Sequence, residues 1–201
     1  WTMTCTRPIF FLLIIILLIE HGRSQDDDSC YCLEQFGTED LNNPVFMEIA
    51  PGDDDRVFVG EQNGLVWLYD RDGNRNAEPF FNVSERFEFS GPVSYGLLAF
   101  TFHPDFQSNR KFYAYFSEMI PGTPLVNRVA EFQTDENNPD VTDMDTERVV
   151  LEIEKDSIGH NGGEMFFGIN DGFLYLSLGD DNSPENAQDL AFLTGKHVRI
   201  D

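Results

Sequence analysis

Short apolar stretches alternate with turns rich in glycine, proline, asparagine and aspartate along the chain from Gln25 onward. In many stretches the aromatic and aliphatic residues share the two faces of a pleat, with the period of two that is typical of a strand. The clearest predicted strands are 45–49, 56–60, 65–69, 97–102, 112–116, 128–132, 149–153, 164–167 and 173–178. No segment shows a long helical period, and only 185–193 indicates a helical turn. The pattern therefore predicts an all-β protein.

A coarse repeat organises these strands. An apolar strand, a polar turn and an aromatic strand recur in 47–60, 100–116 and 165–178. The spacing is roughly 55–60 residues, close to that of one four-stranded propeller blade. A single blade cannot bury both of its faces, so blades must stack around an axis. We expect about the first half of a six-bladed β-propeller, and a β-sandwich is the alternative.

The N-terminal region has the features of a secretory signal peptide. The apolar run 9–19 has eleven residues, whereas a bilayer span needs about 20. Small residues at its end predict cleavage before Gln25, so 1–24 would be upstream residues plus the signal peptide, with an uncleaved anchor as the alternative. We expect 25–29 to be an acidic linker and 30–201 to be the N-terminal part of a truncated propeller. The sequence predicts a secreted, extracellular protein.

The charge narrows the range of partners. The formal net charge is −23 at pH 7. Phosphate backbones repel such a chain, so we expect it not to bind nucleic acid. No aspartate-rich calcium loop with a glutamate at its twelfth position is present, so the sequence predicts no metal ligands of that type.

Three residues fit an oxidising, extracellular compartment. Cys30 and Cys32 are disulfide candidates, but a bridge across one residue would be strained, so we expect their partners elsewhere. Asn82 begins an Asn-Val-Ser sequon and is the predicted glycosylation site.

The run 159–180 carries the main chemical candidates. His160 stands in a glycine-rich turn before one predicted strand, and Asp180 follows the next strand after an Asn-Asp-Gly turn. An antiparallel hairpin returns to its starting end, which predicts that His160 and Asp180 lie together. The pair could transfer protons, and the alternative interpretation is a plain hairpin with a turn histidine.

Several motifs in this order resemble the glucose/sorbosone dehydrogenase-type propellers. They are His-Asn-Gly-Gly at 160–163, Asp-Gly-Phe-Leu-Tyr at 171–175, Gly-Asp at 179–180, Asn-Ala-Gln at 186–188 and Gly-Leu-Leu-Ala-Phe-Thr-Phe-His-Pro-Asp-Phe at 96–106. The segments 30–33, 43–45 and 60–67 are similar to hedgehog-interacting-protein-like members.

The resemblance implies pyrroloquinoline quinone (PQQ) and calcium as cofactors. It places His160 as the general base for a sugar hydroxyl, with Asp180 orienting the sugar or the imidazolium. It also identifies three positions at which this sequence departs from the pattern of the active dehydrogenases. Ser94 stands where active dehydrogenases have a quinone-binding glutamine, Gly159 where they have an aspartate, and Glu164 where an arginine is common.

Two functions follow from this resemblance. One is an extracellular module that binds a secreted protein of the hedgehog type or another ligand. The alternative is a PQQ-dependent sugar or alcohol dehydrogenase with His160 as base. The altered positions favour the binding module.

Overall fold

The computed structural model of the chain describes residues 35–88, 94–119 and 122–201. The signal peptide, the acidic linker, Cys30 and Cys32 lie outside these residues, so those predictions stay predictions. Residues 37–201 form one compact unit. Within the described residues, no helix has the length and apolar character to cross a bilayer.

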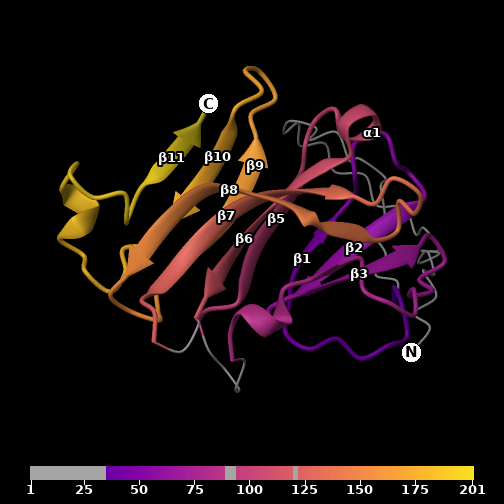
Figure 1. The fold of residues 1–201 in the computed structure, drawn as a ribbon, viewed down its shortest axis with the longest axis horizontal. Coiled ribbons are helices and arrows are strands. Elements are labelled where there is room, and N and C mark those ends of the chain that lie inside the picture. Colours follow the sequence, from indigo (N-terminus) through magenta and orange to yellow (C-terminus); the bar gives the residue numbers. More distant parts are fainter. Residues whose placement is uncertain (1–34, 89–93, 120–121) are drawn as a thin grey trace, which may run out of the picture. The chain divides into compact units, whose positions relative to one another are not determined.

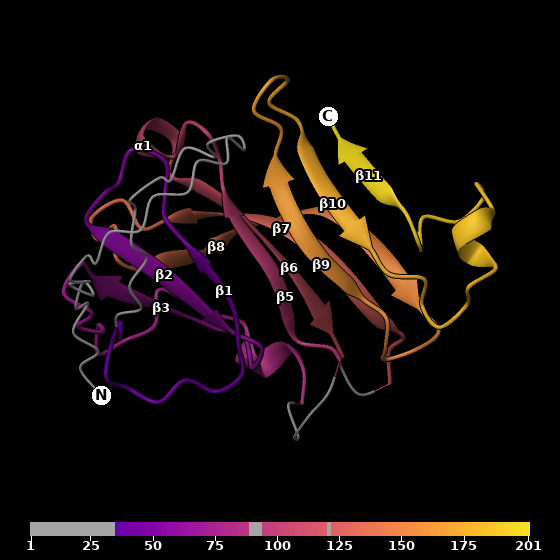
Figure 2. The same ribbon diagram turned by 180° about the vertical axis from the view of Figure 1, so that it is seen from behind.

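Three antiparallel sheets follow one another along the chain (Figures 1 and 2). The first contains β1 (Pro44–Glu48), β2 (Arg56–Glu61), β3 (Leu65–Asp70) and β4 (Phe81–Asn82) in that order. The second contains β5 (Leu97–Phe102), β6 (Lys111–Glu118), β7 (Leu125–Thr134) and β8 (Thr142–Lys155). The third contains β9 (Gly162–Phe167), β10 (Leu174–Leu178) and β11 (His197–Ile200). Each sheet is a meander in sequence order, as expected for propeller blades.

All nine predicted strands are confirmed, and the three predicted hairpins are the pairs β1–β2, β5–β6 and β9–β10. The helical turn expected in 185–193 is the short 3₁₀ helix η2 (Asn186–Gln188). A further 3₁₀ turn, η1 (Ser84–Arg86), and a single-turn helix, α1 (Phe106–Asn109), were not predicted. They are too short to show a helical period.

The middle sheet explains why the strands need neighbours on both faces. Along β6, Phe112 and Phe116 belong to the aromatic core shared with the first sheet, while Tyr113 and Tyr115 belong to the core shared with the third sheet. The ring centroid of Phe112 lies 5.2 Å from that of Phe80, which directly precedes β4 of the first sheet. A strand that is apolar on both faces must be covered twice, which a stack of blades achieves.

The first strands of the three sheets lie next to each other. β5 contacts both β1 and β9, and Pro51, Phe102 and Phe167, at or just after the ends of these strands, line one cavity. The starts of β5 and β9 are joined by a hydrogen bond from the Asn161 side chain to the Ser94 carbonyl. The three strands therefore run in the same direction and give the unit two distinct ends.

Candidate functional site

The His160–Asp180 pair lies at the end where β9 begins and β10 finishes. In the hairpin, Gly162 is opposite Leu178, which brings the residues before β9 beside those after β10. The His160 Nδ1 atom is 2.7 Å from the Asp180 Oδ1 atom. The hairpin geometry predicted this proximity correctly. The catalytic role of the two residues stays a prediction.

The contact with Asp180 defines which ring nitrogen of His160 carries a proton. A carboxylate only accepts hydrogen bonds, so Nδ1 carries the proton that it donates to Asp180. Among the described residues none forms a hydrogen bond with Nε2, and the His160 side chain is 58% exposed. In neutral His160 the Nε2 lone pair is therefore available as a base or as a hydrogen-bond acceptor.

The histidine in turn acts on the carboxylate. The hydrogen bond from His160 is the main cause that lowers the pKa of Asp180, and the Asn182 backbone N–H contributes in the same direction. Asp180 is thus held ionised at neutral pH. A fixed carboxylate beside the ring orients the imidazole.

The backbone at this end is held in an unusual conformation. His160, Asp181 and Asn182 have φ values of +52°, +60° and +58°, in the left-handed region that non-glycine residues rarely adopt. Gly179 permits the close approach of the two loops, because a Cβ atom there would lie 1.8 Å from the His160 carbonyl oxygen. Such conformations persist only where surrounding contacts enforce them.

A buried ion pair supplies one set of those contacts. The Lys155 Nζ atom lies 2.7 Å from the Asp181 Oδ1 atom, and the two side chains are 2% and 5% exposed. Asp181 also accepts hydrogen bonds from the backbone N–H groups of Asp156 and Ser157, at 2.9 and 3.0 Å. Because Asp181 directly follows Asp180, these contacts hold the end of β8 and the loop before His160 against the segment that carries Asp180.

A buried polar network supplies the other contacts, and Asn161 is its centre. The Asn161 amide donates to the carbonyls of Ile158 and Ser94, and its Oδ1 accepts from Asn127 at 2.9 Å. The Tyr115 hydroxyl donates to the Asn161 carbonyl at 2.9 Å. Burial raises the pKa of Tyr115, so it stays a neutral donor. The middle blade therefore positions the loop of the third blade.

The sequence reasoning missed Lys155, Asp181, Asn161 and Asn127 as supports of the site. Asn161 and Asp181 are direct neighbours of the two chosen residues, but a single sequence does not show that they are buried. Lys155 and Asn127 come from other strands, and no local pattern connects them to His160.

Two of the three substituted family positions, Ser94 and Gly159, also lie at this end. Ser94 meets the site through its carbonyl oxygen. Gly159 directly precedes His160, and a Cβ atom there would lie 3.0 Å from the Asn182 side-chain amide nitrogen. The structure therefore brings Ser94, Gly159, His160 and Asp180 together, whereas Asn82 is exposed elsewhere, at the end of β4.

PQQ is a tricarboxylate, so its site needs positive charge. Segment 155–196 carries seven carboxylates and two lysines, a formal charge of −5. Lys155 is paired with Asp181, and the Lys196 amine donates to the carbonyls of Asn186 and Thr194. The described residues around His160 therefore do not fit this cofactor. No cluster of three or more metal-ligating side chains occurs among the described residues either.

Comparisons with solved structures agree with the architecture. The PQQ-bound aldose sugar dehydrogenase of Streptomyces coelicolor superposes with a TM-score of 0.67 and 26% identity, over 83% of this chain and 46% of that chain. The apo aldose sugar dehydrogenase of Escherichia coli gives a TM-score of 0.64 and 25% identity, over 79% and 44%. The fold is thus a dehydrogenase-type propeller.

Sequence comparisons identify the family. The human hedgehog-interacting protein is 29% identical over 91% of this chain and 27% of its own length. The E. coli aldose sugar dehydrogenase YliI is 34% identical over 52% of this chain and 28% of its own length. The chain thus spans well under half the length of these relatives. The sequence profile of the Glucose / Sorbosone dehydrogenase family matches residues 41–201, so the chain belongs to the Glucose / Sorbosone dehydrogenase family.

Proposed function

We propose that the chain is the first half of a secreted six-bladed propeller that binds an extracellular protein of the hedgehog type. The end that carries His160 and Asp180 would be the contact surface. One observation carries the proposal: Asp180 fixes the exposed imidazole, and the described segment 155–196 around it has no unpaired cation for a quinone cofactor.

The local rigidity supports a binding role. The loop of His160 is positioned by the Lys155–Asp181 pair and by Asn161 before any ligand arrives. A preorganised polar group loses little conformational entropy on binding, which raises affinity. The human and mouse hedgehog-interacting proteins match 91% and 86% of this chain.

The experiment uses the full-length secreted protein and an immobilised hedgehog ligand. We expect His160→Ala to weaken binding by about tenfold or more, as for an interface hot spot. His197→Ala is the matched control, because His197 is an exposed histidine at the same end of the third sheet, on β11 opposite Ser177, and lacks the contact with Asp180. Equal binding by both variants and the unchanged protein would refute a contact at His160, and no binding by any of them would refute the hedgehog-type partner.

A second function is favoured by the free Nε2 atom of His160. In a sugar dehydrogenase this atom would take the proton of the substrate hydroxyl, with Asp180 stabilising the imidazolium. The test mixes the same protein with PQQ, calcium, glucose and a dye acceptor. Dye reduction that His160→Ala abolishes and His197→Ala preserves would establish the enzyme, and its absence in a folded protein would reject it.

A further inference from the structure

A second surface lies at the opposite end of the unit from His160. The β9–β10 hairpin closes there in the turn 168–173, because Phe167 is opposite Leu174 in the register. A cavity of about 710 Å³ opens between this turn, the end of β5 and the segment after β1. Nothing in the His160 chemistry uses it.

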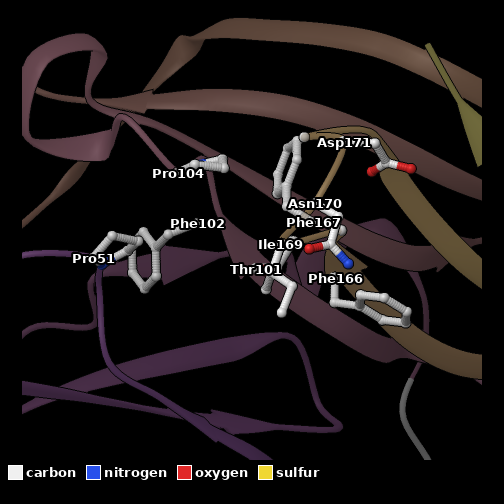
Figure 3. A pocket seen from close by; sticks show the side chains of 11 residues that line it. Pro51, Thr101, Phe102, Pro104, Phe166, Phe167, Ile169, Asn170 and Asp171 are labelled. Atoms are coloured by element: carbon white, nitrogen blue, oxygen red, sulfur yellow. The ribbon is translucent and has the colours of Figure 1, made fainter.

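The walls of the cavity come from all three sheets and are mainly apolar, with Thr101, Asn170 and Asp171 as the polar lining residues (Figure 3). Pro51 follows the first strand of the first sheet, Phe102 and Pro104 come from the second sheet, and Phe167 and Ile169 come from the third. Ile169 is 97% exposed. A large aliphatic side chain on a turn next to an apolar hollow indicates a contact surface more than a solvent-exposed turn.

Asp171 lines this cavity, and further carboxylates lie in the segments next to its other lining residues. Pro51 leads directly into the run Asp53-Asp54-Asp55, and a neighbouring hollow lined by that run also includes Gln107, whose amide donates to the Pro51 carbonyl. Asp105 is exposed directly after Pro104, and Asp171 is exposed in the β9–β10 turn.

Cations offset only part of this charge. Arg56 pairs with Asp53 and Asp140, and Arg71 pairs with Asp55 at 3.4 Å. Arg199 acts on Asp171 and pairs with Asp201. We call the carboxylates of the cavity and of the neighbouring hollow the rim: with Asp201 they number seven (at 53, 54, 55, 105, 140, 171 and 201) against three guanidinium groups, a formal charge of −4.

We infer that this surface docks a basic segment of a partner protein that inserts an apolar side chain into the cavity between Pro51, Phe102 and Ile169. An acidic rim repels anionic lipids and polyanionic glycans, and a mainly apolar lining favours an apolar side chain over a bare cation. A peptide with an apolar residue flanked by lysine or arginine satisfies both parts of the surface. The inference is independent of the function proposed for His160.

The test uses the full-length protein and the fluorescein-labelled peptide Lys-Arg-Phe-Leu-Arg-Lys, measured by fluorescence anisotropy. We expect saturable binding that weakens about tenfold in Ile169→Ala, the loss typical of a truncated apolar anchor. Asp54→Asn/Asp105→Asn should also weaken binding and flatten its dependence on salt. Peptides with Glu flanks, or with Ala in place of Phe-Leu, should not bind.

A matched control separates this surface from general acidity. Glu85→Gln/Glu185→Gln removes two exposed charges at the His160 end and should leave binding unchanged. The inference is overturned if this control weakens binding as much as the rim variant does, or if Ile169→Ala has no effect. Failure of the full-length protein to bind the peptide, as expected if another part of its own chain fills the cavity, also overturns it.

Discussion

The buried Lys155–Asp181 pair is the contact whose removal should disturb the candidate site most. The two atoms are 2.7 Å apart and both side chains are almost fully buried. At an effective dielectric constant of about 20, their gross attraction is about 6 kcal/mol, which desolvation of the two ions largely offsets. Lys155→Met removes the attraction but leaves the Asp181 carboxylate buried.

We expect Lys155→Met to lower the free energy of unfolding by about 3 kcal/mol, near the low end of the range for breaking a buried pair. The low end applies because two backbone N–H groups still donate to Asp181. The double variant Lys155→Met/Asp181→Leu should recover part of this loss, because no charge is then left buried without a partner.

Urea unfolding of the full-length secreted protein measures the effect. The matched control is Arg71→Met, which breaks an exposed pair with side chains 62% and 92% exposed and should cost well under about 1 kcal/mol. Hydrogen exchange of the peptide that contains His160 provides a second readout and should accelerate in Lys155→Met only. The reasoning is refuted if Lys155→Met costs no more than Arg71→Met, or if exchange around His160 is unchanged.

Three further predictions concern the same unit. Gly179→Ala should destabilise the protein by about 3 kcal/mol or more, because its Cβ would collide with the His160 carbonyl. Gly172→Ala has open space around its Cβ at φ +72° and should cost only about 1 kcal/mol. Equal melting temperatures of the two variants in thermal unfolding would contradict the close approach at Gly179. The native-state pKa of Asp180 is lowered, so its hydrogen bond to His160 contributes stability above the unfolded-state pKa of 3.8, and this contribution is lost as the pH falls through the native-state pKa. The difference in unfolding free energy between Asp180→Asn and the unchanged protein should therefore vanish in acid. A difference that grows in acid would contradict this sign. Asn82→Gln should increase the gel mobility of the secreted protein, and unaltered mobility would mean that Asn82 carries no glycan.

Much of the fold could be predicted because each blade has a clear local pattern. The period of two in 112–116 and the Asn-Asp-Gly turn before Phe173 locate strands and hairpins without any tertiary information. The same hairpin logic predicted that His160 and Asp180 meet, since closing one turn fixes the register of both strands. The short elements β4 and α1 could not be predicted, because two to four residues are fewer than a period reveals.

The surroundings of the site depend on contacts between sheets. The sequence shows that residue 155 is a lysine, but its near-complete burial against Asp181 follows from packing of the β8 end under the β9–β10 hairpin. Asn127 likewise reaches Asn161 from another blade. Such contacts join residues far apart in the chain, so a local pattern carries no record of them.

By itself, then, the sequence determined the strands, their hairpins, the strongly acidic charge and the meeting of His160 with Asp180. Only the tertiary structure decided that the imidazole is exposed at Nε2 while a buried ion pair and an asparagine network hold its loop. It also decided that an apolar cavity with an acidic rim opens at the other end. The physical reason is that strand patterns are local, whereas burial, charge pairing and cavities arise from surfaces that meet only when the blades stack.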